Sequence, residues 1–361
     1  MKISSYVIVL GLTHDEKGGS NKQFNRFCEQ SLNSKKYKYI YITNSKNFYQ
    51  QFKNQAHVIF LPFICHPFIN IFFRLSLSLL LNFYFLKKIS LIDFFNPIFL
   101  PSIHNQVAII RDIAELSIKN KYDSLRMLYR TKIMLPLATR FSSRIVAISN
   151  ATKNDLIKYN INLKHKINVI LHGADKTQTE EPSAKKKYFV TLGRLDPIGK
   201  NLIKLLESYK IYRDTGGKYS LHFIGSKWRN SEIFFEKVSK LDLGNNIEVH
   251  DYLSEADKNK IIREAQGLIF ISRYEGFGHP VLESLSLGTI PLLSDIPVFR
   301  EIGSKYAIYC NPVCEYDICR KIRVLEEFNY DFKYKRNVDN YLNRFSWKNM
   351  FLEYENIFSQ R

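Results

Sequence analysis

The sequence has few of the cysteines that would indicate a disulfide-stapled or zinc-binding protein. Its 361 residues contain 5 cysteines, an odd number, which fits a reducing compartment better than a disulfide framework. Three of them cluster between Cys310 and Cys319, but neither a second pair nor a histidine follows at zinc-finger spacing, so we expect no metal site. The chain also lacks repeats and low-complexity tracts, which excludes repeat arrays and extensive disorder.

An uninterrupted apolar run of membrane-spanning length is also missing. The longest apolar stretch, Phe68 to Leu86, is broken by Asn70, Arg74 and Asn82, whereas a span needs about 18 clean apolar residues. The segment Met1 to Leu10 has the pattern of a short strand and not that of a signal sequence. We therefore expect a cytoplasmic protein without a transmembrane helix.

Acidic residues are outnumbered, with 34 Asp and Glu against 53 Lys and Arg, which gives a net charge of +19. Such a protein attracts polyanions: nucleic acid, anionic lipid or phosphorylated substrates. Much of the surplus lies between Lys121 and Lys166, where ten Lys or Arg face only Asp123 and Asp155. This local excess predicts a basic surface.

The basic segment has features of a membrane contact. Arg126 and Arg130 are four positions apart and would share one helix face, with Lys132 and Arg140 further along. Each basic residue near an anionic leaflet contributes about 1 kcal/mol, and the run Phe68 to Leu86 suits partial insertion at the lipid boundary. These features favour peripheral attachment to the inner face of the plasma membrane. The alternative is an ordinary buried helix beside a solvated basic face.

Apolar strand-like runs alternate with helical patterns in both halves of the chain, which predicts parallel βαβ units and an α/β fold. The strand-like runs cover residues 5–10, 37–42, 57–61, 91–94, 106–110, 144–148 and 167–171, and then 188–192, 220–224, 247–250, 267–271, 290–293 and 307–309. A polar segment at residues 174–187 separates the two sets and has the composition of a linker. We expect two doubly wound sheets, and because such sheets bind ligands at the carboxyl ends of their strands, chemistry in a cleft between them.

The most informative motif is RYEGFGHPVLESLSLG, residues 273–288, which follows a predicted strand. Gly276 and Gly278 allow backbone amides to approach a ligand, and a helix beginning near Pro280 presents free N–H groups and the positive end of its dipole. Glu275 in the loop and Glu283 in the first helical turn can each accept two hydrogen bonds, which suits a hydroxyl-rich ligand. Alternatively, the glycines form a tight turn and Glu283 complements the helix dipole.

Two glutamates separated by seven residues, with Gly-Phe-Gly-x-Pro between them, resemble the motif of the retaining family 4 glycosyltransferases (glycosyltransferase group 1). TLGRLDPIGKN, residues 191–201, is similar to that family's Gly-Arg-Leu-x-Pro-x-Lys-Asn segment, with Gly199 as an extra residue. The run HDYLSEADKNKIIREAQGLIFISRYEGFG also resembles the family, although Asp251 replaces its usual glycine. The similar segments IIRDIAEL, RIVAISNATKNDLIK, VILHGAD and RFSWKNM extend the resemblance over nearly the whole chain.

This resemblance implies the GT-B fold, in which two Rossmann-like doubly wound domains face a central cleft. Residues 1–173 would form the acceptor-side domain, which the C-terminal helix at residues 346–361 joins. After the linker at residues 174–187, residues 188–345 would form the domain that binds the nucleotide-sugar donor.

The resemblance also implies roles for individual residues. Arg194 and Lys200 would neutralise the donor pyrophosphate as the nucleoside diphosphate departs. Glu275 would contact the transferred sugar, and Glu283 would hold the ribose hydroxyls. The donor cradle would further include Gly18, Gly19, Tyr252, Gly276, Phe277, Gly278, His279 and Pro280.

One departure concerns the residue beside the reacting sugar. Where the family often has His-Asp after the central strand of its first domain, this chain has Arg111 and Asp112. Arg111 is therefore a candidate catalytic residue, either as a fixed hydrogen-bond donor or as a determinant of acceptor choice. His104 is a weaker substitute, for which a structural role is the alternative.

The implied activity is retaining transfer of a hexose from a nucleoside-diphosphate sugar to a hydroxyl of a lipid-linked oligosaccharide. The leaving phosphate itself helps to remove the acceptor proton in this family, which needs neither a cofactor nor the Asp-x-Asp metal site of the other major glycosyltransferase fold. Abundant Asn, Lys, Ile and Phe indicate an AT-rich bacterial gene and thus a role in surface polysaccharide (O-antigen, capsule or lipopolysaccharide) synthesis.

Two alternatives stay open. A basic nucleic-acid-binding protein would account for the charge, but it would leave the donor motif unexplained, so we expect no nucleic-acid partner. A sugar-nucleotide hydrolase or an oligosaccharide phosphorylase would use the same fold.

Overall fold

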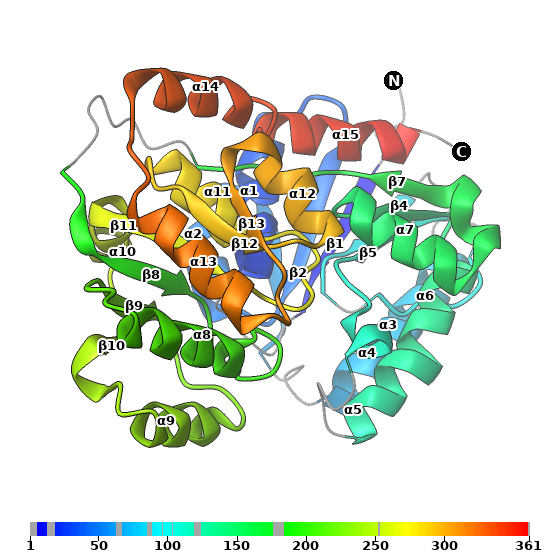
Figure 1. The fold of residues 1–361 in the computed structure, drawn as a ribbon. Helices are drawn as coiled ribbons and strands as arrows, with labels where there is room; N and C mark the ends of the chain where they lie inside the picture. Colours follow the sequence, from blue (N-terminus) through cyan, green and yellow to red (C-terminus); the bar gives the residue numbers. More distant parts are fainter. Residues whose placement is uncertain are drawn as a thin grey trace. The chain divides into compact units, whose positions relative to one another are not determined.

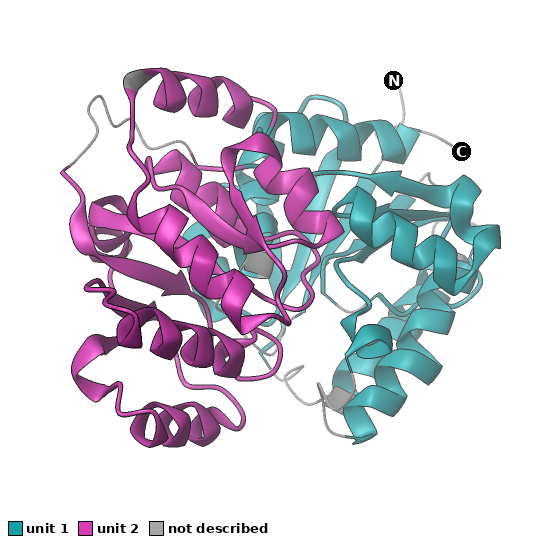
Figure 2. Ribbon diagram, in the orientation of Figure 1, with its two compact units in different colours: residues 1–173, 345–361 teal, residues 174–344 magenta. Residues whose placement is uncertain are grey.

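The structure is a computed structural model that describes residues 6–12, 19–62, 67–84, 89–95, 97–102, 104–118, 124–175, 184–251 and 253–359. The chain forms two compact units, coloured separately in Figure 2. Unit 1 consists of residues 1–173 and 345–361, and unit 2 of residues 174–344.

Unit 1 is built on a parallel seven-stranded sheet with the strand order β3-β2-β1-β4-β5-β6-β7 (Figure 1). Its strands are β1 (Tyr6–Gly11), β2 (Lys38–Thr43), β3 (His57–Phe60), β4 (Ile89–Asp93), β5 (Asn105–Ile110), β6 (Arg144–Ala147) and β7 (Ile167–Val169). The central strands β1, β4 and β5 are buried along nearly their whole length and are mostly apolar, as expected for parallel strands covered on both faces.

The helices of unit 1 lie between its strands in the sequence, except for α15. They are α1 (Gly19–Ser31), α2 (Lys46–Phe52), α3 (Pro67–Tyr84), α4 (Ala114–Ser117), α5 (Ser124–Leu128), the π-helix η1 (Tyr129–Met134), α6 (Leu135–Phe141), α7 (Asn150–Tyr159), the 3-10 helix η2 (Ile161–Lys166) and, from the end of the chain, α15 (Trp347–Ser359). Helix α15 packs on α1, where the ring of Phe27 lies 5.2 Å from that of Phe351 and 5.4 Å from that of Tyr354. A hydrogen bond of 3.0 Å from Gln23 to the Tyr354 hydroxyl ties the same two helices.

Unit 2 has a parallel six-stranded sheet with the order β10-β9-β8-β11-β12-β13. Its strands are β8 (Lys186–Leu192), β9 (Ser220–Ile224), β10 (Ile247–His250), β11 (Ala265–Phe270), β12 (Pro291–Ser294) and β13 (Ile308–Cys310). Its helices are α8 (Leu202–Asp214), α9 (Ser231–Lys240), η3 (Gly244–Asn246), α10 (Glu255–Glu264), α11 (His279–Ser286), α12 (Pro297–Gly303), η4 (Ser304–Tyr306), α13 (Glu315–Glu326) and α14 (Phe332–Leu342).

Both faces of the unit 2 sheet are covered. On one face, Phe189, Leu221 and Phe223 join a core cluster with side chains of α8 and α13. On the other face, the Tyr188 hydroxyl donates to the carbonyl of Ile261 in α10, and the ring of Phe270 lies 5.4 Å from that of Phe299 in α12. This alternation places the ends of the strands, rather than their faces, at the surface.

The expected α/β class with two doubly wound sheets is confirmed. Each of the thirteen predicted strand-like runs is a strand of the structure, and the boundaries agree within two residues. Among the described residues, none of the helices combines the length and the apolar character needed to traverse a bilayer.

Candidate active site

An ion pair joins the carboxyl ends of two neighbouring strands of unit 2. Lys200 follows β8 and Glu275 follows β11, and these strands are adjacent in the sheet. The Lys200 Nζ lies 2.5 Å from the Glu275 Oε1, and both side chains are about one fifth exposed, at 23% and 19%. The Arg273 backbone N–H donates to the Gly199 carbonyl at 3.2 Å, so the two loops are also joined through the main chain.

Two glycines shape the turn that carries Arg194. Gly193 has a φ of +113°, and a Cβ on Gly225 would lie 2.0 Å from the Gly193 carbonyl oxygen, so only glycine fits at Gly225. The Arg194 guanidinium lies 3.9 Å from the ring centroid of Trp228, a stacking contact that restricts its exposed side chain. The turn therefore offers a cation beside the same strand end as Lys200.

The predicted glycine turn leads directly into α11. Gly278 has a φ of +98°, and the helix begins at the next residue, His279, followed by Pro280. Phe277 is 3% exposed and anchors the turn by packing inward. The amides at the helix start are a suitable place for a negatively charged ligand group.

Glu283 differs from the expectation in one respect. It is the fifth residue of α11 and thus lies in the second turn, because the helix starts at His279. The alternative explanation, that Glu283 only complements the helix dipole, is therefore less well supported, because the dipole effect fades beyond the first turn. The Lys258 Nζ lies 3.6 Å from the Glu283 Oε2 and 2.9 Å from a Glu255 oxygen.

In unit 1, Arg111 lies just after β5. Its Nη2 donates to the Gln23 Oε1 at 3.3 Å, and its guanidinium lies 5.1 Å from the ring centroid of Phe95. The enclosed Nε has no hydrogen-bond partner among the described residues, and burial lowers the pKa of the Arg111 guanidinium to about 10. A buried cation with an unused donor at a strand end is suited to an anionic or hydroxyl-bearing ligand.

The analysis of the sequence missed Arg74, which it treated as a break in an apolar run. Arg74 is buried, forms an ion pair with Asp93 at the end of β4, and donates to the Leu12 carbonyl at 2.9 Å and to Asn70 at 2.7 Å. It thus fixes the main chain where β1 ends. The spacing of Asn70, Arg74 and Ser78 was the available signal, because polar residues four apart form one stripe on a helix.

The predicted helix face of Arg126 and Arg130 is wrong. Residues 129–134 form a π-helix, and Arg130 turns inward, with its Nε 3.1 Å from the Oε1 of the buried Glu115. Arg126, Lys132 and Arg140 remain exposed. His104 is structural, since its Nε2 lies 2.9 Å from the Leu81 carbonyl oxygen.

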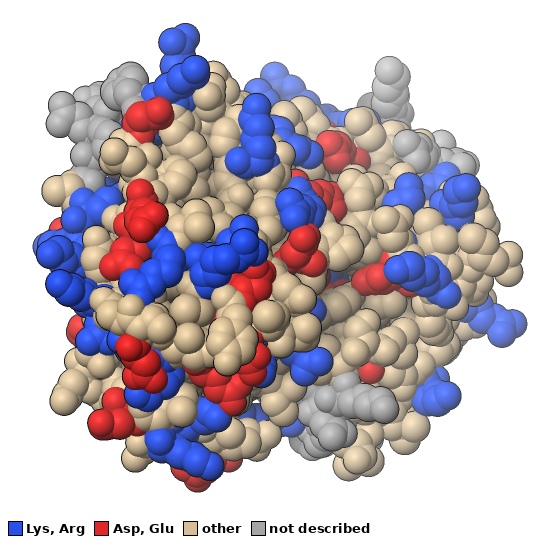
Figure 3. All heavy atoms as spheres, in the orientation of Figure 1, with Lys and Arg blue, Asp and Glu red and all other residues tan. Residues whose placement is uncertain are grey.

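Helix α3 buries its polar stripe and exposes apolar side chains. Ile71 and Leu75 of α3 pack on the core cluster that contains Met134 of η1 and Leu135 of α6. Helix α3 therefore lies beside η1. The exposed apolar residues of this region are Ile69, Phe72, Leu79 and Leu80 in α3, and Leu116, Leu125, Leu128 and Ile133 in α4, α5 and η1. We call this set the apolar surface. Figure 3 shows that the part of unit 1 over α5 and α6 carries mostly uncharged side chains in that view.

The predicted site residues are distributed over both units, and two of them are not described by the structure. Gly18 and Tyr252 lie outside the described residues, and Gly19 is the first residue of α1. Arg111 and Gly19 belong to unit 1, whereas the other described candidates, from Arg194 to Glu283, belong to unit 2. Within unit 2, the structure brings together Lys200 and Glu275, which the sequence separates by 75 positions.

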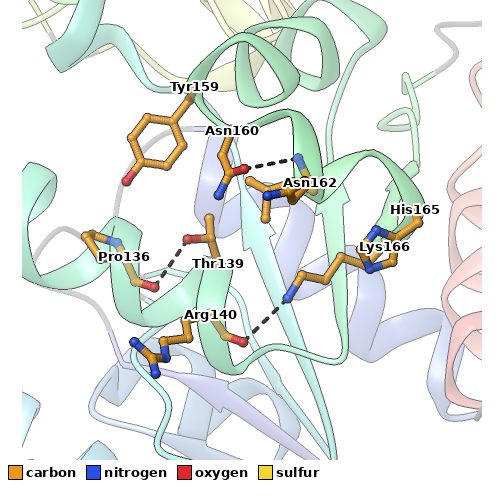
Figure 4. A pocket seen from close by; sticks show the side chains of 9 residues that line it. Pro136, Thr139, Arg140, Tyr159, Asn160, Asn162, His165 and Lys166 are labelled. Atoms are coloured by element: carbon orange, nitrogen blue, oxygen red, sulfur yellow. Dashed lines mark hydrogen bonds between the residues drawn. The ribbon is translucent and has the colours of Figure 1, made fainter.

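A cavity in unit 1 lies away from these strand ends. It has a volume of about 580 Å³ and is lined by Pro136, Thr139, Arg140, Tyr159, Asn160, Asn162, Leu163, His165 and Lys166 (Figure 4). These residues come from α6, α7 and η2, just before β6 and β7 begin. Because ligands of parallel sheets bind at the carboxyl ends of strands, this cavity at the amino ends is not a candidate active site.

Comparison with known proteins finds a family and several relatives that this chain resembles. Residues 174–327 match the family of glycosyl transferases group 1. The O-antigen chain mannosyltransferase RfbU of Salmonella typhimurium is 25% identical over 252 residues, which are 70% of this chain and 68% of that protein. The GDP-mannose:cellobiosyl-diphosphopolyprenol alpha-mannosyltransferase of Xanthomonas campestris is 27% identical over 143 residues, 39% of this chain and 37% of its own.

The fold is also that of a solved structure. WaaG, a glycosyltransferase involved in lipopolysaccharide biosynthesis, superposes with a TM-score of 0.73 at 13% identity, and the match covers 98% of this chain and 100% of WaaG. At this identity the likeness establishes the arrangement of helices and strands.

Proposed function

Because this chain is a group 1 glycosyltransferase with the GT-B fold, we propose that it transfers a hexose, namely mannose from GDP-mannose, to a hydroxyl of a lipid-linked oligosaccharide. The transfer retains the anomeric configuration of the donor and serves the synthesis of a bacterial surface polysaccharide such as O-antigen, capsule or lipopolysaccharide.

The observation that carries this proposal is the Lys200–Glu275 ion pair at adjacent strand ends. A nucleotide sugar presents an anionic diphosphate beside a hydroxyl-rich ring. Its site therefore needs a cation for the diphosphate and, close to it, a hydrogen-bond acceptor for the hydroxyls of the attached sugar. Lys200 and Glu275 provide these two groups. Without donor, each neutralises the other. With donor, Lys200 turns to the diphosphate and Glu275 to the sugar hydroxyls.

The neighbouring groups suit the rest of the donor. Arg194 adds a second cation at the same strand end, and the amides before α11 add donors for phosphate oxygens. Glu283 accepts hydrogen bonds from ribose hydroxyls after it leaves Lys258. These charges would stabilise the departing diphosphate, so we propose that transfer requires no metal ion. The leaving phosphate oxygen then takes the proton from the acceptor hydroxyl.

The choice of mannose is supported by the relatives. Both curated relatives described above are mannosyltransferases, and one of them uses GDP-mannose with an acceptor attached to diphosphopolyprenol. A lipid-linked acceptor of that kind would also explain the apolar surface of unit 1.

We propose that the apolar surface attaches the enzyme peripherally to an anionic membrane, on its cytoplasmic side. Phe72 is 73% and Leu125 81% exposed, and exposed apolar side chains gathered in one region of a protein often mark an interaction site. The exposed cations Arg126 and Lys132 lie in α5 and η1, which carry part of this surface, and Arg140 lies in α6, which follows η1 directly. Apolar insertion combined with basic residues gives reversible binding to anionic lipid.

A donor panel tests the function. Purified protein is incubated with GDP-mannose and with UDP, GDP and dTDP derivatives of other hexoses, with and without a diphosphopolyprenol-linked oligosaccharide, and released nucleoside diphosphate is measured. We expect release from GDP-mannose that depends on the acceptor, together with a product that is one hexose longer.

Other outcomes contradict the proposal. Equal release without acceptor indicates a sugar-nucleotide hydrolase, and sugar phosphate formed from an oligosaccharide and inorganic phosphate indicates a phosphorylase. Turnover with a UDP-hexose only would overturn the choice of mannose. Salt-sensitive DNA binding with no response to any sugar nucleotide would favour a nucleic-acid-binding protein.

A further inference from the structure

Two histidines and a glutamate meet at the β9–β10 edge of the unit 2 sheet. Glu248 is the register partner of His222 in the parallel pair of β10 and β9, so their side chains lie on the same face. His250 follows two positions after Glu248 and therefore shares that face. None of the three belongs to the residues that we assign to the donor or to the acceptor.

We propose that His222, Glu248 and His250 form a binding site for a divalent transition metal such as Zn²⁺. The potential ligand atoms of the three side chains all lie within 4.8 Å of one another. The His250 Nε2 lies 3.3 Å from the His222 Nδ1 and 3.4 Å from the Glu248 Oε1.

These separations match the geometry of a tetrahedral ion. With metal–ligand bonds of about 2.0–2.1 Å, neighbouring ligands of a tetrahedral Zn²⁺ lie about 3.3–3.4 Å apart. Two separations that share the His250 Nε2 have this length, so an ion can sit between the three groups after small side-chain rotations. Imidazole and carboxylate are ligands that Zn²⁺, Co²⁺ and Ni²⁺ accept. A water molecule would complete the fourth position.

The surroundings hold the His222 ring in place. The ring of Tyr188 stacks on it with centroids 4.2 Å apart and an interplanar angle of 12°, and the Ser220 Oγ lies 3.1 Å from the His222 Nε2. The Tyr188 hydroxyl is itself bonded to the Ile261 carbonyl at 2.9 Å. Such outer contacts orient a ligating histidine and favour binding through its other nitrogen, here the Nδ1 that faces His250.

The cluster is also accessible. The side chains of His222 and His250 are 14% and 16% exposed, and that of Glu248 is 58% exposed, so an ion can enter from solvent and Glu248 can move to meet it. Strand β10 is the edge of the sheet and pairs only with β9 among the described strands. A metal ion bound by both strands would therefore fasten this edge, whereas sugar transfer would proceed without it.

The competing explanation is a hydrogen-bonded network without metal, in which each histidine donates one proton. Metal binding distinguishes the two. Tag-free full-length protein is stripped with chelator and titrated with CoCl₂, because tetrahedral Co²⁺ absorbs visible light. We expect saturation at one Co²⁺ per chain with micromolar or tighter affinity, displacement by ZnCl₂, and a higher Tm with Zn²⁺ than without.

Two variants each remove one proposed ligand, and they differ in how much the substitution could disturb the fold. Glu248→Gln changes a mostly exposed side chain, and His250→Gln removes a central ligand. Each should lower Co²⁺ affinity at least about tenfold and abolish the Zn²⁺-dependent rise in Tm, with sugar transfer unchanged. His57→Gln, at an exposed histidine of β3, is the control and should bind Co²⁺ as the wild type does. No saturable Co²⁺ binding by the wild type, or equal affinity in Glu248→Gln, would overturn the metal site and would leave the proposed transferase function untouched.

Discussion

Lys200 and Glu275 lie 75 positions apart in the sequence, yet the Lys200 Nζ is 2.5 Å from the Glu275 Oε1. The pair exists because β8 and β11 are neighbours in a parallel sheet whose strands all end at one edge. Each charge is partly neutralised by the other, so this pair adds little net charge to the surface of unit 2. If the proposed function is right, a donor has to separate the two side chains and replace the contact between them.

Replacing Glu275 by alanine should lower kcat with the preferred donor by a factor of about 100 or more, because a preorganised polar contact to the reacting sugar is lost. Circular dichroism checks that the variant is folded. Glu236→Gln, on the exposed side of α9, is the matched control and should keep wild-type kcat. A folded Glu275→Ala protein with unchanged kcat contradicts the role of Glu275.

Chelation should leave transfer nearly intact. Arg194 and Lys200 supply positive charge at the strand end, so excess EDTA is expected to change kcat by less than about twofold, with released GDP as the measure. The same treatment should remove Co²⁺ from the His222–His250 cluster. If EDTA abolishes turnover and Mg²⁺ or Mn²⁺ restores it, the two cations do not suffice for the diphosphate.

The new glycosidic bond should keep the anomeric configuration of the donor. With GDP-α-mannose the product is then an α-mannoside, which the one-bond C1–H1 coupling in its NMR spectrum identifies. A β-linked product would exclude the proposed mechanism, even if the chain transfers mannose.

Membrane binding should depend on the apolar surface and on its cations. We expect wild-type protein to float with liposomes that contain anionic lipid at low salt. The double variant Phe72→Ser, Leu125→Ser should lose this binding at every salt concentration. Arg126→Ala, Lys132→Ala should bind more weakly than the wild type at low salt, and its binding should change less as salt rises.

The control for membrane binding lies in unit 2. Val313 and Tyr316 are 63% and 75% exposed and have no place in the apolar surface, so Val313→Ser, Tyr316→Ser should bind liposomes as the wild type does. Wild-type protein that stays at the bottom of the gradient at low salt contradicts the membrane proposal. Equal binding by all variants assigns the contact to another surface.

Stability should depend on the protonation of Lys185. Its Nζ donates to the Arg263 and Gly288 carbonyls and to Thr289, and burial, followed by the nearby Arg263, lowers the pKa of its ammonium group to about 7. The unfolded chain has a lysine pKa of about 10.4. Between these values the unfolded state binds more protons than the native state, so stability rises with pH.

Lys185→Met removes this titration. Urea denaturation between pH 7 and pH 9 should show the wild type gaining stability over the variant by at most about 1.4 kcal/mol per pH unit. Below pH 7 both states carry the charge and the difference should become constant. Parallel stability curves over the whole range would show that the Lys185 pKa is not shifted in this way.

The strands and the donor loop could be predicted from the sequence because their signals are local. Apolar runs between polar helical stretches defined every strand. Gly276 and Gly278, which lie within a few residues of the start of α11, marked the turn before that helix. Lys200 and Glu275 were predicted separately, by a family resemblance. Their direct ion pair required knowledge of the strand order, which alternation of strands and helices leaves open.

Other residues could not be placed because their environment depends on tertiary packing. The spacing of polar residues could place Arg74 on a polar stripe of α3, but its partners Asp93 and Leu12 are brought to it only by β4 and β1. Arg130 left the predicted helix face because the local π-helix changes the angle between successive side chains. His222 and Glu248 became neighbours only through the register of β9 and β10.

Because of helix α15, unit 1 can finish folding only after unit 2 has been synthesised. Gln23 and Tyr354, which bond each other, are 331 positions apart, and Phe27, fully buried, has Phe351 and Tyr354 among its ring contacts. On the ribosome, α1 therefore emerges well before α15 and keeps this apolar face uncovered until residues 347–359 have left the exit tunnel. Unit 2 is continuous in sequence and can fold before that moment. The unit that is translated first is thus the one that matures last, and chaperones that shield apolar surface have the longest time to act on it.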